Sequence, residues 1–270
     1  MRIAIVGGGN MARAIIGGLV AKGIRAADIL VVEIDAPARL RLVAEFGVTT
    51  LEAAGPMLVH ADVLLLAVKP QNMREAAEAA APHLAQPLVI SVAAGIRLGD
   101  LGRWLGGRAR LVRAMPNTPA LVQAGIAGLY APPAVDQDAR SQAEAVLRAV
   151  GRVVWVADET QLDAVTAVSG SGPAYVFYFL EALEAAAIDL GLPADVGRRL
   201  ALATFEGSVK LALQSGEPPA TLRANVTSKG GTTARAIHVL DEAHVSDAVV
   251  AAVKGAAARA RELGDEFGEG

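Results

Sequence analysis

Apolar and polar positions divide the chain into two parts with different periodicity. In the first part, short apolar runs alternate with segments that are apolar at every third or fourth position, which predicts alternating strands and helices. The expected strands cover residues 2–6, 29–32, 61–68, 87–92, 110–113, 125–130 and 152–156, with a short strand from residue 48. The expected helices run from the first glycine turn to residue 22 and over residues 37–46, 74–84, 98–105 and 138–150.

The alternation ends near Val156, and every later periodic segment is helical. These later segments cover residues 175–190, 194–215, 219–225, 233–240 and 245–263. We therefore predict an α/β protein with a doubly wound sheet in residues 1–160 and an all-α domain in residues 161–270. The last seven residues, Gly264 to Gly270, are expected to fray.

A glycine turn follows the first strand and opens the first helix. Its residues, Gly7-Gly-Gly-Asn-Met-Ala12, match G-x-G-x-x-A, whose glycines let the backbone turn and approach a pyrophosphate. Glu33 ends the second strand, where such a fold places an acid on the adenosine ribose; the alternative is an ordinary strand-end charge. Lys69 and Pro70 follow the most apolar strand, at the edge where open sheets bind ligands. The first domain is predicted to be Rossmann-type.

Two glycine-rich and hydroxyl-rich segments precede helices in the second part. At the first, Ser171 or Gly172 can cap a helix that has Pro173 in its first turn. The helix that follows, residues 175–190, is apolar nearly all round and is expected to be buried at a subunit contact. The second segment, Val226-Thr-Ser-Lys-Gly-Gly-Thr-Thr233, also enters a helix. Two such helix starts predict a pocket for a carboxylate or phosphate, and well-capped core helices are the alternative.

Composition excludes several kinds of chemistry. The 270 residues are 53% hydrophobic with a formal net charge of -3, and we find no basic stripe, so nucleic acid is not an expected partner. The chain has no cysteine, which excludes disulfides and thiolate catalysis. No apolar run reaches the ~20 residues that span a bilayer, and no metal-ligand spacing is present. We expect a cytoplasmic protein without a metal or a membrane segment.

The polar residues offer no strong general acid or base. None of the four histidines lies in a motif: His60, His83, His238 and His244. Ser169 and Ser171 have no adjacent histidine that would activate them as nucleophiles. Hydride transfer to a protonated C=N bond needs positioning and a carboxylate clamp, whereas an alcohol dehydrogenase needs a base. The sequence therefore favours reduction of an imine.

The whole chain resembles the pyrroline-5-carboxylate reductase family. The matching runs lie in both domains: 7–11, 67–71 (Ala-Val-Lys-Pro-Gln), 91–95 (Ser-Val-Ala-Ala-Gly), 115–119 (Met-Pro-Asn-Thr-Pro), 163–166, 169–175 and 226–233. The resemblance implies a helical domain of the 6-phosphogluconate-dehydrogenase-like kind that interleaves with a second subunit, with homodimers that often assemble into decamers. It also implies hydride transfer from NADPH or NADH to Δ1-pyrroline-5-carboxylate, giving L-proline in the last step of its biosynthesis.

The resemblance assigns site residues by position. The cofactor would be held by Val6, Gly7, Gly8, Gly9, Asn10, Met11, Glu33, Ala67, Val68, Lys69, Pro70, Val92, Ala93 and Ala94. The substrate would meet Glu159, Asn225, Ser228, Gly231, Thr232 and Thr233. Thr233 is the candidate catalytic residue, through a hydrogen bond to the substrate or its nitrogen.

Two positions depart from the family pattern. Lys229 stands where many members have proline, and we expect its side chain to point to solvent. Glu33 and Asp35 are acidic where several members have small or hydroxyl residues beside the 2′-phosphate of NADPH. Arg39 and Arg41 are expected on an exposed helix face, so the acids should repel that phosphate. NADH is therefore expected to serve at least as well as NADPH.

Three other functions are compatible with parts of this pattern. A β-hydroxyacid dehydrogenase would need a lysine on the helix after its glycine-rich loop, and here none occurs from Pro173 until Lys210. A reductase of another cyclic imine carboxylate differs by as little as one methylene, worth ~1–3 kcal/mol in a pocket. A non-catalytic NAD(P)-binding regulatory protein would bind the cofactor without turning over an imine.

Overall fold

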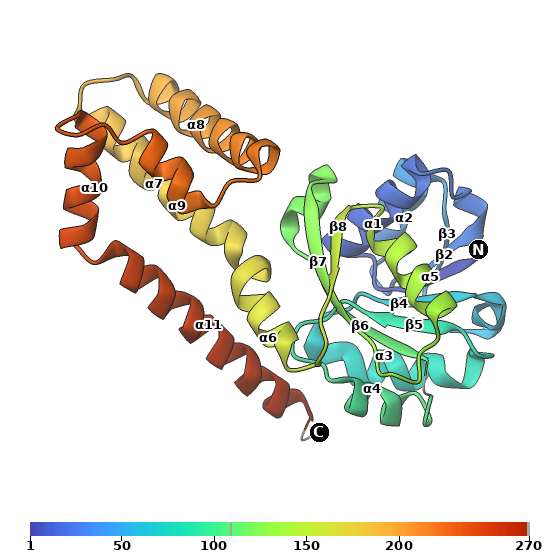
Figure 1. Cartoon of the computed structure of the whole chain (residues 1–270). Helices are drawn as coiled ribbons and strands as arrows, with labels where there is room; N and C mark the ends of the chain where they lie inside the picture. Colours follow the sequence, from blue (N-terminus) through green and yellow to red (C-terminus); the bar gives the residue numbers. More distant parts are fainter. Residues whose placement is uncertain (109, 269–270) are drawn as a thin grey trace. The chain divides into compact units, whose positions relative to one another are not determined.

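The computed structural model describes residues 1–108 and 110–268, and the chain divides into two compact units (Figure 1). One unit consists of Met1–Ser171 together with the C-terminal residues from Gly255 onward. The other consists of Gly172–Lys254 and is entirely built from helices and their connections. We expected the domain boundary between residues 160 and 161. The long segment of the first unit ends at Ser171, 11 residues after residue 160.

The first unit contains an eight-stranded sheet in the order β3-β2-β1-β4-β5-β6-β7-β8. The strands are β1 (Ile3–Val6), β2 (Ile29–Val32), β3 (Thr49–Leu51), β4 (Val63–Leu66), β5 (Leu88–Ser91), β6 (Leu111–Met115), β7 (Gly125–Tyr130) and β8 (Gly151–Trp155). Strands β1 to β6 are parallel, and β7 and β8 run the opposite way. This is the predicted doubly wound sheet, and each strand lies where the apolar pattern places it.

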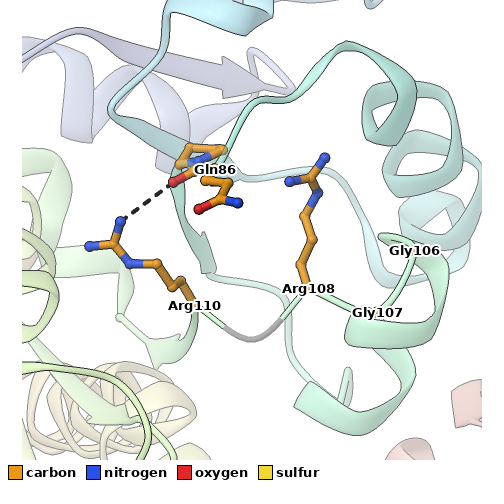
Figure 2. Close-up of a pocket in the computed structure, with 6 residues that line it drawn as sticks. Gln86, Gly106, Gly107, Arg108 and Arg110 are labelled. Atoms are coloured by element: carbon orange, nitrogen blue, oxygen red, sulfur yellow. Dashed lines mark hydrogen bonds between the residues drawn. The ribbon is translucent and has the colours of Figure 1, made fainter.

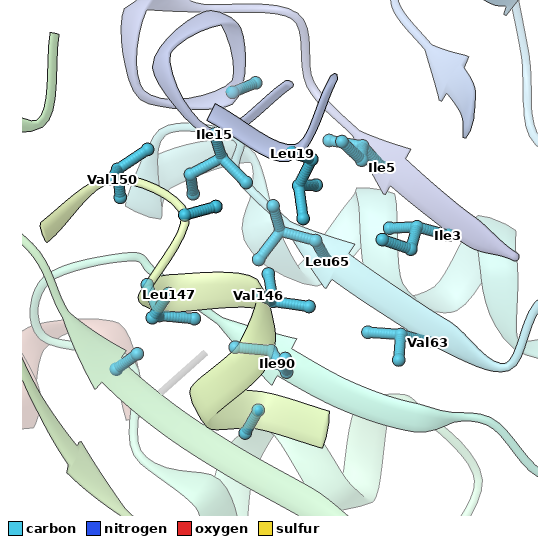
Figure 3. Close-up of a cluster of buried hydrophobic side chains, with 14 of the residues drawn as sticks. Ile3, Ile5, Ile15, Leu19, Val63, Leu65, Ile90, Val146, Leu147 and Val150 are labelled. Carbon is cyan, nitrogen blue, oxygen red and sulfur yellow. The ribbon is translucent and has the colours of Figure 1, made fainter. Parts of the chain in front are cut away.

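Helices cover both faces of the sheet because successive strand residues point to opposite sides. On one face, Ile5, Leu65 and Ile90 meet Ile15 of α1 (Asn10–Ala21) and Val146 of α5 (Gln137–Leu147), as Figure 3 shows. On the other face, the alternate strand residues pack against α3 (Met73–Ala80) and α4 (Leu98–Trp104). Full burial of one such aliphatic side chain contributes ~1.5–3 kcal/mol. Helix α2 (Ala36–Phe46) packs its Leu42 into the same cluster as α1 and α5, and it begins with Asp35 accepting a hydrogen bond from the Ala38 N–H.

The helix expected to start at Ser171 or Gly172 is α7 (Gly172–Asp189), which begins there. It is preceded by α6 (Gln161–Val165) and a π-helical turn, Thr166–Gly170. The Ser171 N–H donates to the Thr166 carbonyl at 2.8 Å and closes this turn directly before α7. Pro173 lies in the first turn of α7, where its missing N–H leaves no helical hydrogen bond unmade. That this helix start binds an anion stays a prediction.

The helical unit consists of α7, α8 (Ala194–Ser215), α9 (Pro219–Asn225), α10 (Thr232–Glu242) and the first part of α11 (Val245–Gly268). Helices α7 and α8 approach closely at Gly197, where a Cβ would lie 2.8 Å from the Ala187 methyl. Of the described α7 side chains, Leu180 alone is buried within the chain. Across the described residues, no helix has both the length and the apolarity needed to cross a membrane.

The end of α11 packs within the sheet-containing unit. Asp265 forms an ion pair of 2.6 Å with Arg97, and the Phe267 ring lies against Gly95. These contacts keep the chain helical to Gly268, so the expectation of fraying is wrong for residues 264–268. The last two residues of the expected frayed tail lie outside the described part of the chain.

Candidate functional site

The ends of four strands converge at one edge of the sheet. The Gly7 N–H donates to the Val32 carbonyl at 2.8 Å, and the Ala67 N–H donates to the Val6 carbonyl at 2.8 Å. The Val92 N–H donates to the Leu66 carbonyl at 3.1 Å and continues the same series of hydrogen bonds between strand ends. The chain leaves β1 toward β2 and returns at β4, so the crevice between the ends of β1 and β4 is a topological switch point, where such sheets bind ligands.

Of the three glycines after β1, Gly7 and Gly8 pack against the protein itself, and Gly9 leaves room for a ligand at this edge. Gly7 has φ +98°, and a Cβ there would lie 2.8 Å from the Ala67 carbonyl carbon. A Cβ on Gly9 would have no atom within 4 Å. Gly9 also precedes the first turn of α1, which has no side-chain cap and therefore offers its N–H groups to an anion. Asn10 is exposed and Met11 half-buried at the start of that helix. The open glycine cradle fits the pyrophosphate of a dinucleotide.

Glu33, directly after β2, reaches the glycine turn that follows β1. Its Oε2 accepts a hydrogen bond from the Gly8 N–H at 2.6 Å, and its Oε1 accepts one from the Asp35 N–H at 2.8 Å. Arg39 was expected on an exposed face, and that expectation is wrong: it donates to the Glu33 and Ile34 carbonyls because α2 turns it back over the strand end. Arg41 is exposed, as expected, with its nearest acidic oxygen, on Asp35, at 3.9 Å.

The other predicted cofactor residues flank the same edge. Val68 and Pro70 are half-buried after β4, and Lys69 between them is exposed. Pro70 begins a 3₁₀ turn, Pro70–Asn72. After β5, Ala93 is buried and donates its N–H to the Ser91 hydroxyl at 3.4 Å, with Val92 and Ala94 half-buried on either side. The structure thus brings the whole predicted cofactor set to one edge of the sheet.

Glu159 is held inside the sheet-containing unit. Its Oε1 accepts hydrogen bonds from the Leu98 N–H at 2.8 Å, at the start of α4, and from Arg113 at 3.2 Å. Arg113 is only 4% exposed and also lies 3.8 Å from Asp163. Removing one partner of such a buried pair typically costs ~3–5 kcal/mol. Sequence reasoning missed Arg113, because nothing local marks a strand arginine as buried.

The remaining predicted substrate residues lie in the helical unit, around the start of α10. Gly231 is the residue before the helix, and no side chain caps it, so its first N–H groups are available to a carboxylate. A Cβ on Gly231 would lie 2.6 Å from the Ser228 hydroxyl, which explains the glycine. Thr232 is exposed and Thr233 half-buried. Asn225, at the end of α9, donates to Glu217 at 3.3 Å. Lys229 is exposed, as expected.

Asn117 is a second residue that sequence reasoning did not single out. Its Nδ2 donates to the Ser169 carbonyl at 3.1 Å, and its Oδ1 accepts from the Ile126 N–H at 2.9 Å. The available signal was the run from Met115 to Pro119, in which two prolines enclose one amide side chain.

The other cavities lie away from this edge. A pocket of about 420 Å³ is lined by Gln86, Pro87, Gly106, Gly107, Arg108 and Arg110, at the amino ends of β5 and β6 (Figure 2). Arg110 donates there to the Gln86 carbonyl at 3.4 Å. None of the predicted site residues lines it. Within residues 1–108 and 110–268, no cluster of three histidine or carboxylate side chains is suited to hold a metal ion.

Comparison with known proteins identifies the family. A family model described as pyrroline-5-carboxylate reductase dimerisation matches residues 159–263, and one described as NADP oxidoreductase, coenzyme F420-dependent, matches residues 2–95. The pyrroline-5-carboxylate reductase of Pseudomonas aeruginosa is 43% identical over 269 residues, which is 99% of this chain and 98% of that protein. The chain belongs to the pyrroline-5-carboxylate reductase family.

Solved structures of this family have the same fold over the whole chain. The pyrroline-5-carboxylate reductase of Coxiella burnetii is 40% identical and superposes with a TM-score of 0.92, covering 97% of this chain and 98% of that one. The enzyme of Plasmodium falciparum, solved with NADP bound, is 26% identical with a TM-score of 0.87 and 98% coverage of both chains. Membership of this family sets aside the β-hydroxyacid dehydrogenase alternative.

Proposed function

We propose that this protein transfers a hydride from NADH or NADPH to the protonated C=N bond of Δ1-pyrroline-5-carboxylate and releases L-proline. The observation that carries the proposal is the dinucleotide cradle at the β1–β4 switch point, in a chain that is 43% identical end to end to a pyrroline-5-carboxylate reductase.

The glycine loop and the start of α1 bind the pyrophosphate. Gly7 makes the turn, Gly9 leaves the approach open, and the N–H groups of the first helical turn donate to phosphate oxygens. Residues 67–70 and 92–94 flank the nicotinamide side. When bound, the reduced cofactor supplies the hydride.

The start of α10 binds the substrate. Its unpaired N–H groups and the hydroxyls of Ser228, Thr232 and Thr233 hold the carboxylate, since a helix N-terminus favours a negative charge. Thr233 donates a hydrogen bond to the substrate or its nitrogen. Asn225 and Gly231 shape the loop. Glu159, in the sheet-containing unit, keeps the turn before α4 in place through the Leu98 N–H, and its contact with the substrate stays a prediction.

Glu33 favours NADH. The two oxygens of the Glu33 carboxylate accept hydrogen bonds from the Gly8 and Asp35 N–H groups. The negative charge is therefore fixed where a 2′-phosphate would sit. Arg39 is occupied by two carbonyls and by Glu52 at 3.5 Å. NADH is therefore expected to be used at least as well as NADPH.

The helical unit forms a homodimer. Several apolar side chains of α7 are exposed in the single chain, with Phe177 59% and Tyr178 71% exposed. An apolar cavity of about 470 Å³ lies within this unit. It is lined by Tyr175, Tyr178 and Phe179 of α7 and by residues of α11 such as Val249. A monomeric protein rarely exposes so much apolar surface. Further assembly into decamers and a cytoplasmic location stay predictions.

The direct test is the loss of reduced-nicotinamide absorbance on addition of Δ1-pyrroline-5-carboxylate, with the product identified by chromatography. Formation of one proline for each cofactor oxidised supports the proposal. Cofactor binding without oxidation would instead favour the regulatory alternative or another cyclic imine.

A further inference from the structure

One carbonyl at the end of the π-helical turn has no donor within that turn. The turn ends at Gly170, and the Ser169 carbonyl lies at its C-terminal end, where the last carbonyls of a helical segment have no internal partner. Ser169 is half-buried, and a carbonyl removed from water without a donor costs free energy. The segment therefore needs a donor from elsewhere.

Asn117 supplies that donor. Its Nδ2 lies 3.1 Å from the Ser169 carbonyl oxygen. The orientation of the amide is determined by its other end, because the Ile126 N–H at 2.9 Å requires an acceptor and therefore faces Oδ1. The side chain thus joins the start of β7 to the π-helical turn.

The contact lies at the edge of the sheet where the cofactor is proposed to bind. Asn117 follows Met115, the last residue of β6, and β6 runs parallel to β5. Its end therefore points to the same edge as Gly7 and Val92. A Cβ on Gly170 would lie 2.7 Å from the Met115 methyl, so the backbone of Gly170 packs directly on that side chain. Met115 and Asn117 together hold Ser169 and Gly170 at this edge.

We propose that Asn117 is a positioning residue of the reductase reaction. It supplies the donor that the end of the π-helical turn lacks and so fixes the backbone of Ser169 and Gly170 at the edge of the sheet where the cofactor is proposed to bind. This inference rests on the proposed function. A displacement of ~1 Å in such a site can lower the rate about 100-fold, so a small shift of this backbone is sufficient to affect kcat.

Asn117→Asp is the first test. The substitution keeps an oxygen for the Ile126 N–H and replaces the Nδ2 donor by an oxygen that faces the Ser169 carbonyl. We expect kcat to fall about 10-fold to 100-fold, while the dissociation constant of NADH changes by less than about twofold because the glycine loop is untouched. Val122→Ala, an exposed change in the turn that follows Asn117, is the control and should leave both values unchanged.

The melting temperature separates positioning from stability. A purely structural role would lower the melting temperature of Asn117→Asp and leave kcat at 25 °C unchanged. That result would overturn the inference.

A further variant and a second readout keep the test decisive. If Asn117→Asp does not fold, Asn117→Ser replaces it, since the shorter side chain removes the Nδ2 donor without adding a charge. If the wild-type protein does not reduce Δ1-pyrroline-5-carboxylate, the proposed function fails by itself. The contact is then judged from melting temperatures: an unchanged melting temperature of Asn117→Asp would overturn it.

Discussion

The glycines after β1 have different roles, although the motif treats them alike. Gly7 is required by the fold, because its φ of +98° and the 2.8 Å approach of a Cβ to Ala67 exclude a side chain. Gly9 has an extended φ of -71° and open space around it, so the fold itself does not require a glycine there. Its lack of a side chain is explained by the approach of a ligand.

Gly9→Val and Gly7→Ala should therefore separate binding from stability. Gly9→Val should keep the melting temperature and lose NADH binding by at least about 100-fold, because the side chain fills the pyrophosphate approach. Gly7→Ala should lower the melting temperature. Fluorescence titration and thermal unfolding measure the two effects, and tight NADH binding by Gly9→Val would show that the cradle is not the cofactor site.

Glu33→Gln tests the origin of cofactor preference. The amide oxygen can still accept from the Gly8 N–H, while the negative charge facing a 2′-phosphate is removed. We expect the KM for NADPH to fall about tenfold, equivalent to ~1.4 kcal/mol, with the KM for NADH changed much less. Steady-state kinetics with both cofactors measure this, and Glu75→Gln, at an exposed position of α3, is a control for general charge loss. Equal changes for NADH and NADPH would contradict the assignment.

The environment of Glu144 predicts that the stability of the fold decreases in acid. The Trp155 indole N–H donates to it at 2.6 Å and Arg148 at 3.0 Å, and these hydrogen bonds hold the pKa of the Glu144 carboxyl below its usual value. A carboxyl with a lowered pKa stabilises the fold above its unfolded-state pKa, and this contribution is lost from about pH 5 downward. Glu144→Gln keeps an acceptor for Trp155 without the titration. Its melting temperature should fall less than that of the wild type between pH 7 and pH 4; an equal fall would exclude the effect.

Among the elements, the strands and the start of α7 were predictable, and the contact that Asn117 makes before α7 was not. Buried parallel strands such as β4 are recognisable as continuous apolar runs. The junction at Ser169–Pro173 has the local pattern of a helix start, and α7 begins there. The hydrogen bond from Asn117 to the Ser169 carbonyl joins residues distant in sequence, and no local signal encodes it. For the same reason, the sequence did not predict the buried ion pairs of Arg113, whose partners Glu159 and Asp163 lie about 50 residues away in the chain.

Helix α10 is the element on which the substrate assignment depends. Thr233→Ala should lower kcat/KM about 10-fold to 100-fold, the scale of one lost charge-assisted hydrogen bond, with NADH affinity retained. Thr221→Ala, an exposed threonine on α9 of the same unit, is the matched control. Steady-state kinetics provide the measurement. Unchanged kinetics of Thr233→Ala would remove this residue from the site.

For the whole molecule, the hydrophobic pattern predicted a sheet-containing domain and a helical domain. It did not predict that the C-terminal helix α11 contributes residues to both units. The predicted division assigns all of α11 to the helical domain, whereas its residues from Gly255 onward group with the sheet-containing unit. The contacts that account for this are the Phe267 ring against Gly95 and the ion pair between Asp265 and Arg97. Such contacts depend on tertiary structure and cannot be read from helical periodicity. The apolar character of α7, in contrast, was visible in the sequence.

The exposed face of α7 predicts self-association. Phe177→Glu places a charge where an apolar partner surface is expected, so the dimer should dissociate at micromolar concentration. Sedimentation velocity measures the change, with Gln137→Glu on the exposed start of α5 as a control of equal charge. A wild-type protein that sediments as a monomer at that concentration would refute the dimer.

The most direct test of the proposed reaction is the oxidation of reduced nicotinamide by Δ1-pyrroline-5-carboxylate, run in parallel with NADH and NADPH. We predict oxidation with one L-proline formed for each cofactor consumed, and a kcat/KM for NADH at least equal to that for NADPH. Binding of both cofactors without any oxidation would contradict the proposed reaction.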